Sequence, residues 1–412
     1  MILNFRVSNY KSIKEEIELS LIPSNVKGGN NVITIINSKA ERNNIYKALT
    51  SVGIYGANAS GKSNLIEAFY EFRKMVYESS ENKPDQVIEA FKPFKLNDDS
   101  LKKATTFAMD FVINNIIYMY NIAFNSEVIV EEKLVYYPKG RELKIFEREY
   151  QEIKKGNGYK GIFESVKERT TKNQLFLTKA STENLSFAID VVNYIHKNNI
   201  LTTGLLHTDR FDEVLNDLFF LEDTPFRKQV ISLINKLDTQ IEGVICQDDE
   251  IYTIHVNNKG EKIRFSVKEE SSGTQRIISF VNVIIMCLYT GASLIVDEFE
   301  RSLHPEIAKY LLQLFNDPEI NTKGAQFIFA THDVTLLSPE NNLRRDQICL
   351  IEKNEKGESE LYAISDIKGI REGNIEKWYL EGRLGGMPAL SKETFKKGWL
   401  EFIKEEDEKK KE

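Results

Sequence analysis

The stretch from Gly56 to Ser63 has a glycine, four further residues and then Gly-Lys-Ser, which is the pattern of a phosphate-binding P-loop. Glycines in such a loop let backbone amides converge on phosphate oxygens, the lysine reaches the β and γ phosphates, and the serine hydroxyl can bind Mg²⁺. A helix that begins at the lysine also directs its N-terminal dipole at the anion. The sequence therefore predicts a nucleoside triphosphate site made by Gly56, Asn58, Ala59, Ser60, Gly61, Lys62, Ser63 and Asn64.

Two adjacent acids, Asp297 and Glu298, follow the apolar run 293–296, which has the composition of a buried parallel strand. Open α/β sheets bind ligands at the carboxyl ends of their strands. At that place Asp297, together with Ser63, would hold Mg²⁺, and Glu298 would orient or deprotonate the water that attacks the γ phosphate. Acid pairs are common on surfaces, but unpaired carboxylates at the edge of a core are costly, and this favours the catalytic interpretation.

Two further groups could face the same phosphate. A second apolar run, 325–330, precedes Thr331 and His332 and should end at the same sheet edge, where His332 would sense the γ phosphate. A single histidine is, however, more often an ordinary core or surface residue. The block from Ser272 to Gln275 opens an apolar helix, and a serine with a glycine there can bind an anion or simply cap the helix. Taken alone, this block is interpreted more simply as a cap.

The composition is that of a globular protein, because 41% of the 412 residues are apolar and 10% are aromatic. The formal net charge of −7 gives no global reason to expect a nucleic-acid or membrane partner, although an average can conceal a local basic patch. Three separated cysteines without a CxxC pair indicate buried thiols in a reducing compartment. The N-terminus has a strand pattern, and no apolar run approaches the ~18 residues that span a bilayer. We expect a soluble, cytoplasmic protein without a membrane partner.

The chemistry-bearing residues must be positioned by a sheet and the helices beside it. Short strand patterns occupy 1–55, and the apolar spacing after the P-loop predicts a helix. Alternating β-branched and aromatic residues predict an antiparallel sheet in 104–147, whereas 150–240 has a charged, helical pattern. Strand patterns return from Val244 and then alternate with helices. The predicted fold class is α/β, with a mixed central sheet, an antiparallel β subdomain and an inserted helical region.

Together, the motifs resemble those of an ABC-class ATPase of the SMC, RecF and OLD group. Gly56 to Ser63 resembles Walker A, Ser272 to Gln275 the signature motif, Ile295 to Glu298 Walker B, and His332 the switch histidine. More narrowly, the extended P-loop and the C-terminal stretch Trp-Tyr-Leu-Glu-Gly-Arg-Leu-Gly-Gly-Met-Pro at 378–388 resemble stand-alone OLD-subfamily ATPases. That subfamily includes the AbiL and RloA types, which are often encoded beside a separate effector.

The resemblance implies ATP and Mg²⁺ as cofactors and a head-to-tail homodimer that encloses ATP. In this group the signature serine and glycine of one subunit contact the γ phosphate at the P-loop of another, which implies a trans role for Ser272, Gly273 and Gln275. The turn that ends in Lys11 and Ser12 resembles the Asn-aromatic-basic-Ser element of RecF-like ATPases, and this would place both residues near the nucleotide.

The resemblance also divides the chain into four parts. Residues 1–150 would form the N-terminal half of an ATPase head with its β subdomain, 151–243 the inserted helical region, 244–370 the C-terminal half of the head, and 371–412 a C-terminal segment. Roughly 80 residues follow His332, which is too few for a toprim nuclease domain. Any nuclease would then belong to a separate effector protein.

Three functions are consistent with this pattern. The first is an ATP-hydrolysing switch, a homodimer or higher homo-oligomer that controls an effector such as a nuclease or toxin in anti-phage defence. The second is a DNA-repair or chromosome-handling ATPase that clamps duplex DNA, but acids are interleaved with the basic residues of 138–174. The third is a scaffold that binds ATP without hydrolysing it. We favour the first because the nucleotide motifs form a full set and the sequence has no second catalytic centre.

Overall fold

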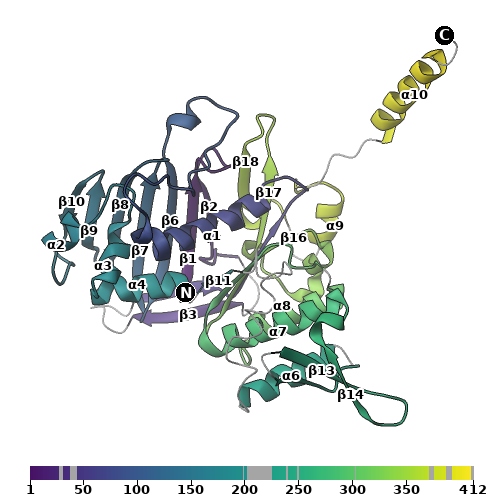
Figure 1. The fold of residues 1–412 in the computed structure, drawn as a ribbon. Helices are drawn as coiled ribbons and strands as arrows, with labels where there is room; N and C mark the ends of the chain where they lie inside the picture. The colour runs from purple at the N-terminus through teal and green to yellow at the C-terminus, as the bar shows by residue number, and fades with distance from the viewer. Residues whose placement is uncertain are drawn as a thin grey trace.

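Helix α1 (Lys62–Glu78) lies between two large β-sheets and links them into one body (Figure 1). The computed structural model describes residues 1–26, 31–37, 44–197, 199–201, 225–237, 240–247, 250–301, 303–370, 375–386 and 392–409. The predicted α/β class, with a mixed sheet and an antiparallel β subdomain, is confirmed by this arrangement.

The mixed sheet carries the P-loop strand at its centre. Its strand order is β11-β15-β16-β5-β17-β18; the first five strands run parallel, and β18 pairs antiparallel with β17. The central strands are buried on both faces, which explains their continuous apolar sequences. The bounds are β5 Ser51–Tyr55, β11 Asn199–Leu201, β15 Ser293–Val296, β16 Gln326–Thr331, β17 Ile348–Lys353 and β18 Ser359–Ala363.

The second large sheet is antiparallel throughout, with the order β10-β9-β8-β7-β6-β1-β2. Its strands β1 and β6 are buried along almost their whole length, whereas β10 at the edge has three exposed residues. The N-terminal strands β1 and β2 join strands β6 to β9, which form in or overlap the predicted β region 104–147, while β10 follows that region. The bounds are β1 Ile2–Ser8, β2 Ile17–Ser20, β6 Thr105–Ile113, β7 Ile116–Phe124, β8 Ile129–Tyr136, β9 Leu143–Glu149 and β10 Glu152–Lys155.

Aromatic packing fixes α1 against the antiparallel sheet. The ring of Phe69 stacks on Phe5 of β1 at 3.7 Å between centroids, and Phe72 packs edge-on against Phe107 of β6. The opposite side of the same core contains Ile54 of the P-loop strand and Ile328 of β16. The helix that begins at the P-loop is therefore held by both sheets.

Helices α7 (Ser272–Thr290) and α8 (Pro305–Asn316) belong to a second core beside β15 and β16. In this core, the ring of Phe299 makes edge-to-face contacts with Phe280 of α7 and Phe327 of β16. By length and composition, α7 is the one helix among the described residues that could cross a membrane, but 61% of that window is buried inside the protein. Burial of this kind is typical of the core helix of a globular domain.

The predicted helical region 151–243 contributes both helices and strands. Its helices are α2 Glu164–Glu168, α3 Phe176–Thr182, α4 Ser186–Lys197 and α6 Pro225–Leu237. The same region supplies β10 to the edge of the antiparallel sheet and β11 to the edge of the mixed sheet. These two strands have only four and three residues, which is too short for sequence periodicity to reveal.

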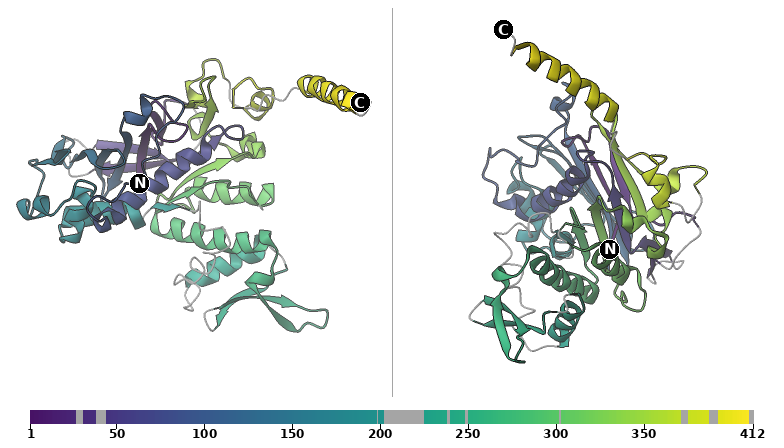
Figure 2. Two further views of the ribbon diagram at one scale, coloured as in Figure 1. Left: turned by 45° about the horizontal axis from the view of Figure 1, so that its top comes forward. Right: turned by 90° about the vertical axis from the view of Figure 1, so that its right-hand side faces the viewer.

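The remaining elements lie at the periphery. Figures 1 and 2 place the sheet β12-β13-β14 at one end of the molecule and the C-terminal helix α10 at the other. The bounds are β3 Val32–Asn37, β4 Asn44–Leu49, β12 Gly243–Gln247, β13 Glu250–Val256, β14 Lys262–Ser266, α9 Ile375–Leu380 and α10 Lys392–Lys409. Short 3-10 helices occupy Ser79–Glu81, Ser100–Lys102, Val267–Glu269, Val334–Leu337, Pro339–Asn341, Arg345–Gln347 and Ile364–Asp366.

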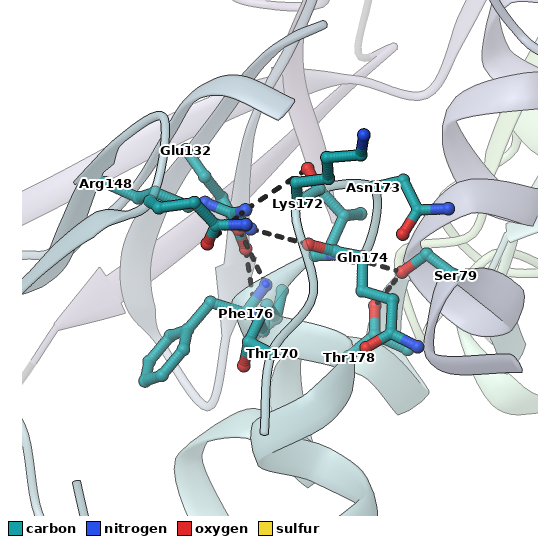
Figure 3. A network of polar contacts seen from close by, with 12 residues as sticks. Ser79, Glu132, Arg148, Thr170, Lys172, Asn173, Gln174, Phe176 and Thr178 are labelled. Carbon is teal, nitrogen blue, oxygen red and sulfur yellow. Dashed lines mark hydrogen bonds and ion pairs between the residues drawn. The ribbon is translucent and has the colours of Figure 1, made fainter. Parts of the chain in front are cut away.

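A buried ion pair attaches the start of α3 to the antiparallel sheet (Figure 3). Glu132 of β8 and Arg148 of β9 are completely shielded from solvent, with 3.7 Å between Oε2 and Nη1. The Glu132 carboxylate accepts hydrogen bonds from the backbone amides of Phe176 and Leu177, while Arg148 donates to the carbonyl of Gln174. Because both charges are also hydrogen-bonded, the network satisfies a helix N-terminus that would otherwise be buried without partners.

Candidate active site

The P-loop turns sharply from β5 into α1, and its glycines allow that turn. A Cβ on Gly56 would lie 2.2 Å from the carbonyl oxygen of Ile351, so the strand and β17 can approach only with glycine there. Gly61 has φ +119, and a Cβ on it would lie 2.3 Å from Ser359 Oγ. The loop therefore has the backbone conformation and the close packing that its sequence predicts.

Lys62 folds back over the loop. Its Nζ donates hydrogen bonds to the carbonyl oxygens of Gly56, at 2.8 Å, and Ala57, at 3.0 Å, and lies 3.4 Å from His332 Nδ1. Burial lowers the pKa of Lys62 to about 8, although Asp297 and the neighbouring glutamates act in the opposite direction. An anion at this position would stabilise the charged ammonium, and phosphate oxygens could replace the two carbonyl contacts.

Sheet register brings the predicted catalytic residues to one edge. Val296 at the end of β15 pairs with Phe329, and Thr331 at the end of β16 pairs with Tyr55 at the end of β5. The residues that follow, Asp297 and His332, therefore project from neighbouring strands beside the P-loop. This is the carboxyl edge of a parallel sheet, where such folds bind ligands.

The acid and the hydroxyl that were predicted to hold Mg²⁺ belong to the same site. The pKa of the Asp297 carboxyl is raised chiefly by burial, while the nearby Ser63 hydroxyl acts in the opposite direction. Oxygen ligands of this kind suit Mg²⁺, which usually takes one or two protein ligands and completes its shell with water and phosphate. Ser60 Oγ is buried in the loop without a hydrogen-bond partner. Buried hydroxyls normally have a partner, and a phosphate oxygen in the loop would provide one. The residues present fit a magnesium nucleotide.

Glu298 occupies a turn directly after the buried strand. Its φ of +51 is in the left-handed region, which is uncommon for a non-glycine residue. Arg276 Nη2 donates to its carbonyl oxygen at 2.8 Å, and Arg301 Nη1 lies 3.1 Å from its carboxylate Oε2. The carboxylate is about half exposed, at 51%. The turn thus presents Glu298 at the surface next to Asp297, while its backbone is held by the signature helix α7.

Glu300 is a site residue that the sequence analysis did not select. Its carboxylate accepts hydrogen bonds from Thr331 Oγ1 at 2.6 Å and from the backbone amide of His332 at 2.8 Å. It therefore fixes the backbone from which His332 projects. Burial and the nearby Lys62 lower the pKa of His332, so its neutral form is favoured. The sequence offered only a weak signal for Glu300: it is a third acid two residues after Glu298, and it belongs to no known motif.

The N-terminal turn lies against the P-loop through Ser12. Asn64 Nδ2 donates to Ser12 Oγ at 2.6 Å, and Ser359 Oγ lies 2.7 Å from both Ser12 Oγ and the carbonyl oxygen of Ser60. Lys11 instead pairs with Glu67 on α1. Ser12 is thus part of the loop's support, as is Ser359, which the sequence did not indicate.

The signature block lies at the start of α7, where two adjacent serines differ in their contacts. Ser271 Oγ accepts a hydrogen bond from the Thr274 amide at 3.1 Å and so caps the helix. Ser272 is exposed, and Gln275 Nε2 bonds the carbonyl oxygen of Glu270 at 2.8 Å. In the described part of the chain, no hydrogen bond or ion pair joins Ser272, Gly273 or Gln275 to the P-loop. The structure does not bring the block together with the P-loop of its own chain.

The C-terminal motif packs on the P-loop from the side of β17. Gly386 donates its amide to Glu352 Oε2 at 3.1 Å and accepts a hydrogen bond from Tyr379 at 3.1 Å. A Cβ on Gly386 would lie 3.6 Å from Gly56 Cα, and the ring of Tyr379 packs edge-on against Tyr55. Met387 and Pro388 of the motif lie outside the described residues.

A P-loop, an acid pair and a histidine that converge at the edge of a parallel sheet define the class of the protein, a P-loop ATPase domain of the α/β type. Residues 51–338 match the family model described as "AAA domain, putative AbiEii toxin, Type IV TA system", and the chain belongs to this family. Membership of the narrower OLD subfamily stays a prediction. No curated protein sequence matches the chain.

Solved structures similar to the chain include SMC head domains. One is an SMC head bound to the C-winged helix domain of ScpA, with 13% identity and a TM-score of 0.46, covering 88% of this chain and 97% of that one. Another is the SMC head of Thermotoga maritima, with 14% identity and a TM-score of 0.40, covering 88% and 98%. A third, an SMC head with an extended coiled coil from Pyrococcus furiosus bound to the C-terminal domain of ScpA, has 12% identity, a TM-score of 0.44 and coverage of 88% and 96%.

Proposed function

We propose that the protein is an ATP-hydrolysing switch that dimerises around Mg·ATP and controls a separate effector protein, in the cytoplasm, as part of an abortive-infection type of defence. The observation that carries this proposal is the division of the predicted machinery. Lys62, Asp297 and His332 converge at one sheet edge, whereas Ser272 is exposed at the start of another helix, and within the described residues no hydrogen bond or ion pair joins it to that edge. A second copy of the chain would bring the two halves together.

The residues at the sheet edge divide the work of hydrolysis. Lys62 would exchange its loop carbonyls for the β and γ phosphate oxygens, and Ser63 and Asp297 would hold Mg²⁺, which supplies neutralisation of phosphate charge when bound. Glu298 would leave Arg301 and accept the proton of the attacking water. His332, fixed through Glu300, would contact the γ phosphate and report its presence to β16.

Dimer closure would link hydrolysis to the effector. Ser272 and Gly273 of one copy would face the γ phosphate bound by the other, so that ATP stabilises the closed pair and its hydrolysis opens it. The family description, which names a putative toxin of a type IV toxin–antitoxin system, supports a role in such a system.

The decisive experiment is the substitution Glu298→Gln, which keeps the shape and removes the base. We expect ATP binding to persist, phosphate release to fall by about 100-fold or more, and ATP to strengthen self-association in light-scattering measurements. Glu319→Gln, a change at an exposed residue in the turn after α8, serves as the control. A Glu298→Gln chain that still hydrolyses ATP at the wild-type rate, or whose self-association is the same with and without ATP, would contradict the proposed switch.

A DNA-clamping function has less support in the contacts. Lysines of the antiparallel sheet that could form a basic surface are paired with acids, as in Lys144 with Glu147 and Lys154 with Glu152. Such pairs reduce the positive field that phosphate binding needs. Salt-dependent binding of the purified protein to unrelated duplexes would favour this alternative.

A further inference from the structure

Helix α10 presents an apolar face that no part of the described chain covers. Phe395, Trp399, Phe402 and Ile403 recur at the spacing of one helix face, and their exposed fractions are 71%, 51%, 49% and 39%. The rings of Phe395 and Trp399, and of Trp399 and Phe402, pack on one another along the helix. Figure 1 and the left view of Figure 2 show α10 standing apart from both sheets. Contiguous apolar surface of this kind marks an interaction site.

The charges along the helix indicate what the face binds. Residues 392–400 carry three lysines and one glutamate, a net charge of +2, whereas 401–409 carry five acids and two lysines, a net charge of −3. The helix dipole does not explain this order, because it favours acids near the N-terminus and cations near the C-terminus. Two such helices side by side in opposite directions would each place a basic half beside an acidic half.

We propose that α10 pairs in antiparallel orientation with the α10 of a second copy of this chain, and that this pairing does not require nucleotide. The apolar faces would pack at the centre of the pair around Trp399, and the unlike charges would flank them. Helix dipoles in opposite directions would add to the preference. An anionic membrane fits this helix less well, because the acidic half would be repelled.

This pairing is a second contact between the two copies, in addition to the proposed contact that encloses ATP. A pair held through α10 keeps two heads at high local concentration, so that ATP-driven closure becomes an intramolecular step. The two contacts are separable by experiment, because α10 stands apart from α1 and from the parallel strands that carry the predicted catalytic residues (Figure 1).

Oligomeric state without nucleotide tests the pairing in the full chain. We expect the wild-type chain to form dimers in sedimentation experiments, and the double variant Trp399→Glu/Phe402→Glu to associate at least about ten-fold more weakly. Ile162→Glu, which changes another exposed apolar residue, should leave the dimer intact, as should Lys62→Ala. A wild-type chain that is monomeric without nucleotide, or an α10 variant as dimeric as the wild type, would overturn the proposal.

Engineered cysteines test the direction of pairing. An antiparallel pair centred on Trp399 brings Phe395 of one helix opposite Ile403 of the other, while the two copies of Phe395 are separated by about 12 Å along the axis, beyond the reach of a disulfide. A mixture of Phe395→Cys and Ile403→Cys chains should therefore form disulfide-linked dimers under mild oxidation, whereas each variant alone should not. Cross-linking of each variant to itself, without cross-linking between the two, would show parallel pairing and contradict the proposal. ATP-driven association of a Glu298→Gln chain carrying the α10 changes reports separately on the nucleotide-enclosed dimer.

Discussion

At the scale of single residues, the burial of Lys62 sets how the site responds to pH. Lys62 is buried beside backbone carbonyls, and its pKa is lowered to about 8 because the fold stabilises the charged ammonium less than water does. Between pH 8 and the ordinary value of 10.5, the folded chain binds fewer protons here than the unfolded chain, so this group makes the protein more stable as pH rises through that window. Phosphate binding should reverse the shift.

Proton uptake should therefore accompany ATP binding above pH 8. Because the phosphates stabilise the charged form of Lys62, the association constant should fall as pH rises through 8, by at most about ten-fold per pH unit. Calorimetric titrations at pH 7, 8 and 9, in buffers that differ in ionisation enthalpy, measure both the affinity and the protons taken up. Lys62→Arg keeps a charge that does not titrate in this range, so its residual binding should be independent of pH. A pH-dependent affinity in that variant would assign the effect to another group.

The two adjacent serines of the signature block offer a matched comparison. Ser271 caps α7 through the Thr274 amide, so Ser271→Ala should lower the free energy of unfolding by about 1 kcal/mol and leave hydrolysis per folded molecule largely intact. Ser272 is exposed, and Ser272→Ala should leave the unfolding transition unchanged but impair ATP-driven association and hydrolysis. Denaturant unfolding and phosphate release, measured on both variants, distinguish the roles. If Ser272→Ala hydrolyses ATP normally, the proposed trans contact of this serine is wrong.

At the scale of elements, the C-terminal motif supports the P-loop, and its glycines allow this to be tested. Gly385 and Gly382 both have left-handed φ values, +79 and +70, so alanine at either should cost about 1 kcal/mol. Only at Gly385 would the new methyl group clash, with Tyr362 and Glu352, and push the turn off the P-loop side of β17. We expect Gly385→Ala to weaken ATP binding several-fold more than Gly382→Ala at equal stability. Equal affinities in fluorescent-nucleotide titrations would show that the turn does not act on the site.

Sequence reasoning recovered the elements whose signals are local. The P-loop, the acid pair and the strand before His332 lie within short stretches, and the spacing of apolar residues fixes their elements. Ser359 and Glu300 were not predicted, because a serine that supports the loop from 299 residues away, or an acid that holds a neighbouring strand, follows no periodic pattern. Residues 151–243 were predicted as an inserted helical region, and the short strands β10 and β11 within it were not predicted, since strand pairing partners are set by the tertiary fold.

At the scale of the whole molecule, the proposed switch would use two copies of the chain for one complete site. The P-loop edge and the exposed Ser272 lie on different elements, and no hydrogen bond or ion pair joins them within the described residues. Isologous pairing would make two composite sites per dimer, each with the P-loop of one copy and the signature block of the other. Helix α10, if it pairs as proposed, would keep the copies together between cycles.

Mixing two inactive variants tests this composition directly. Lys62→Ala should lose ATP binding by about 100-fold while keeping an intact signature block, and Ser272→Ala should keep its P-loop. A mixed dimer then has one site with Lys62 from one copy and Ser272 from the other. Random pairing at equal amounts makes half the dimers mixed, each with one intact site of two, so about one quarter of the wild-type phosphate release should return. Lys62→Ala mixed with the double variant Lys62→Ala/Ser272→Ala should recover nothing. If the first mixture also stays inactive, although a pull-down between differently tagged chains shows that mixed dimers form, Lys62 and Ser272 act within a single chain and the enclosed-dimer mechanism is excluded.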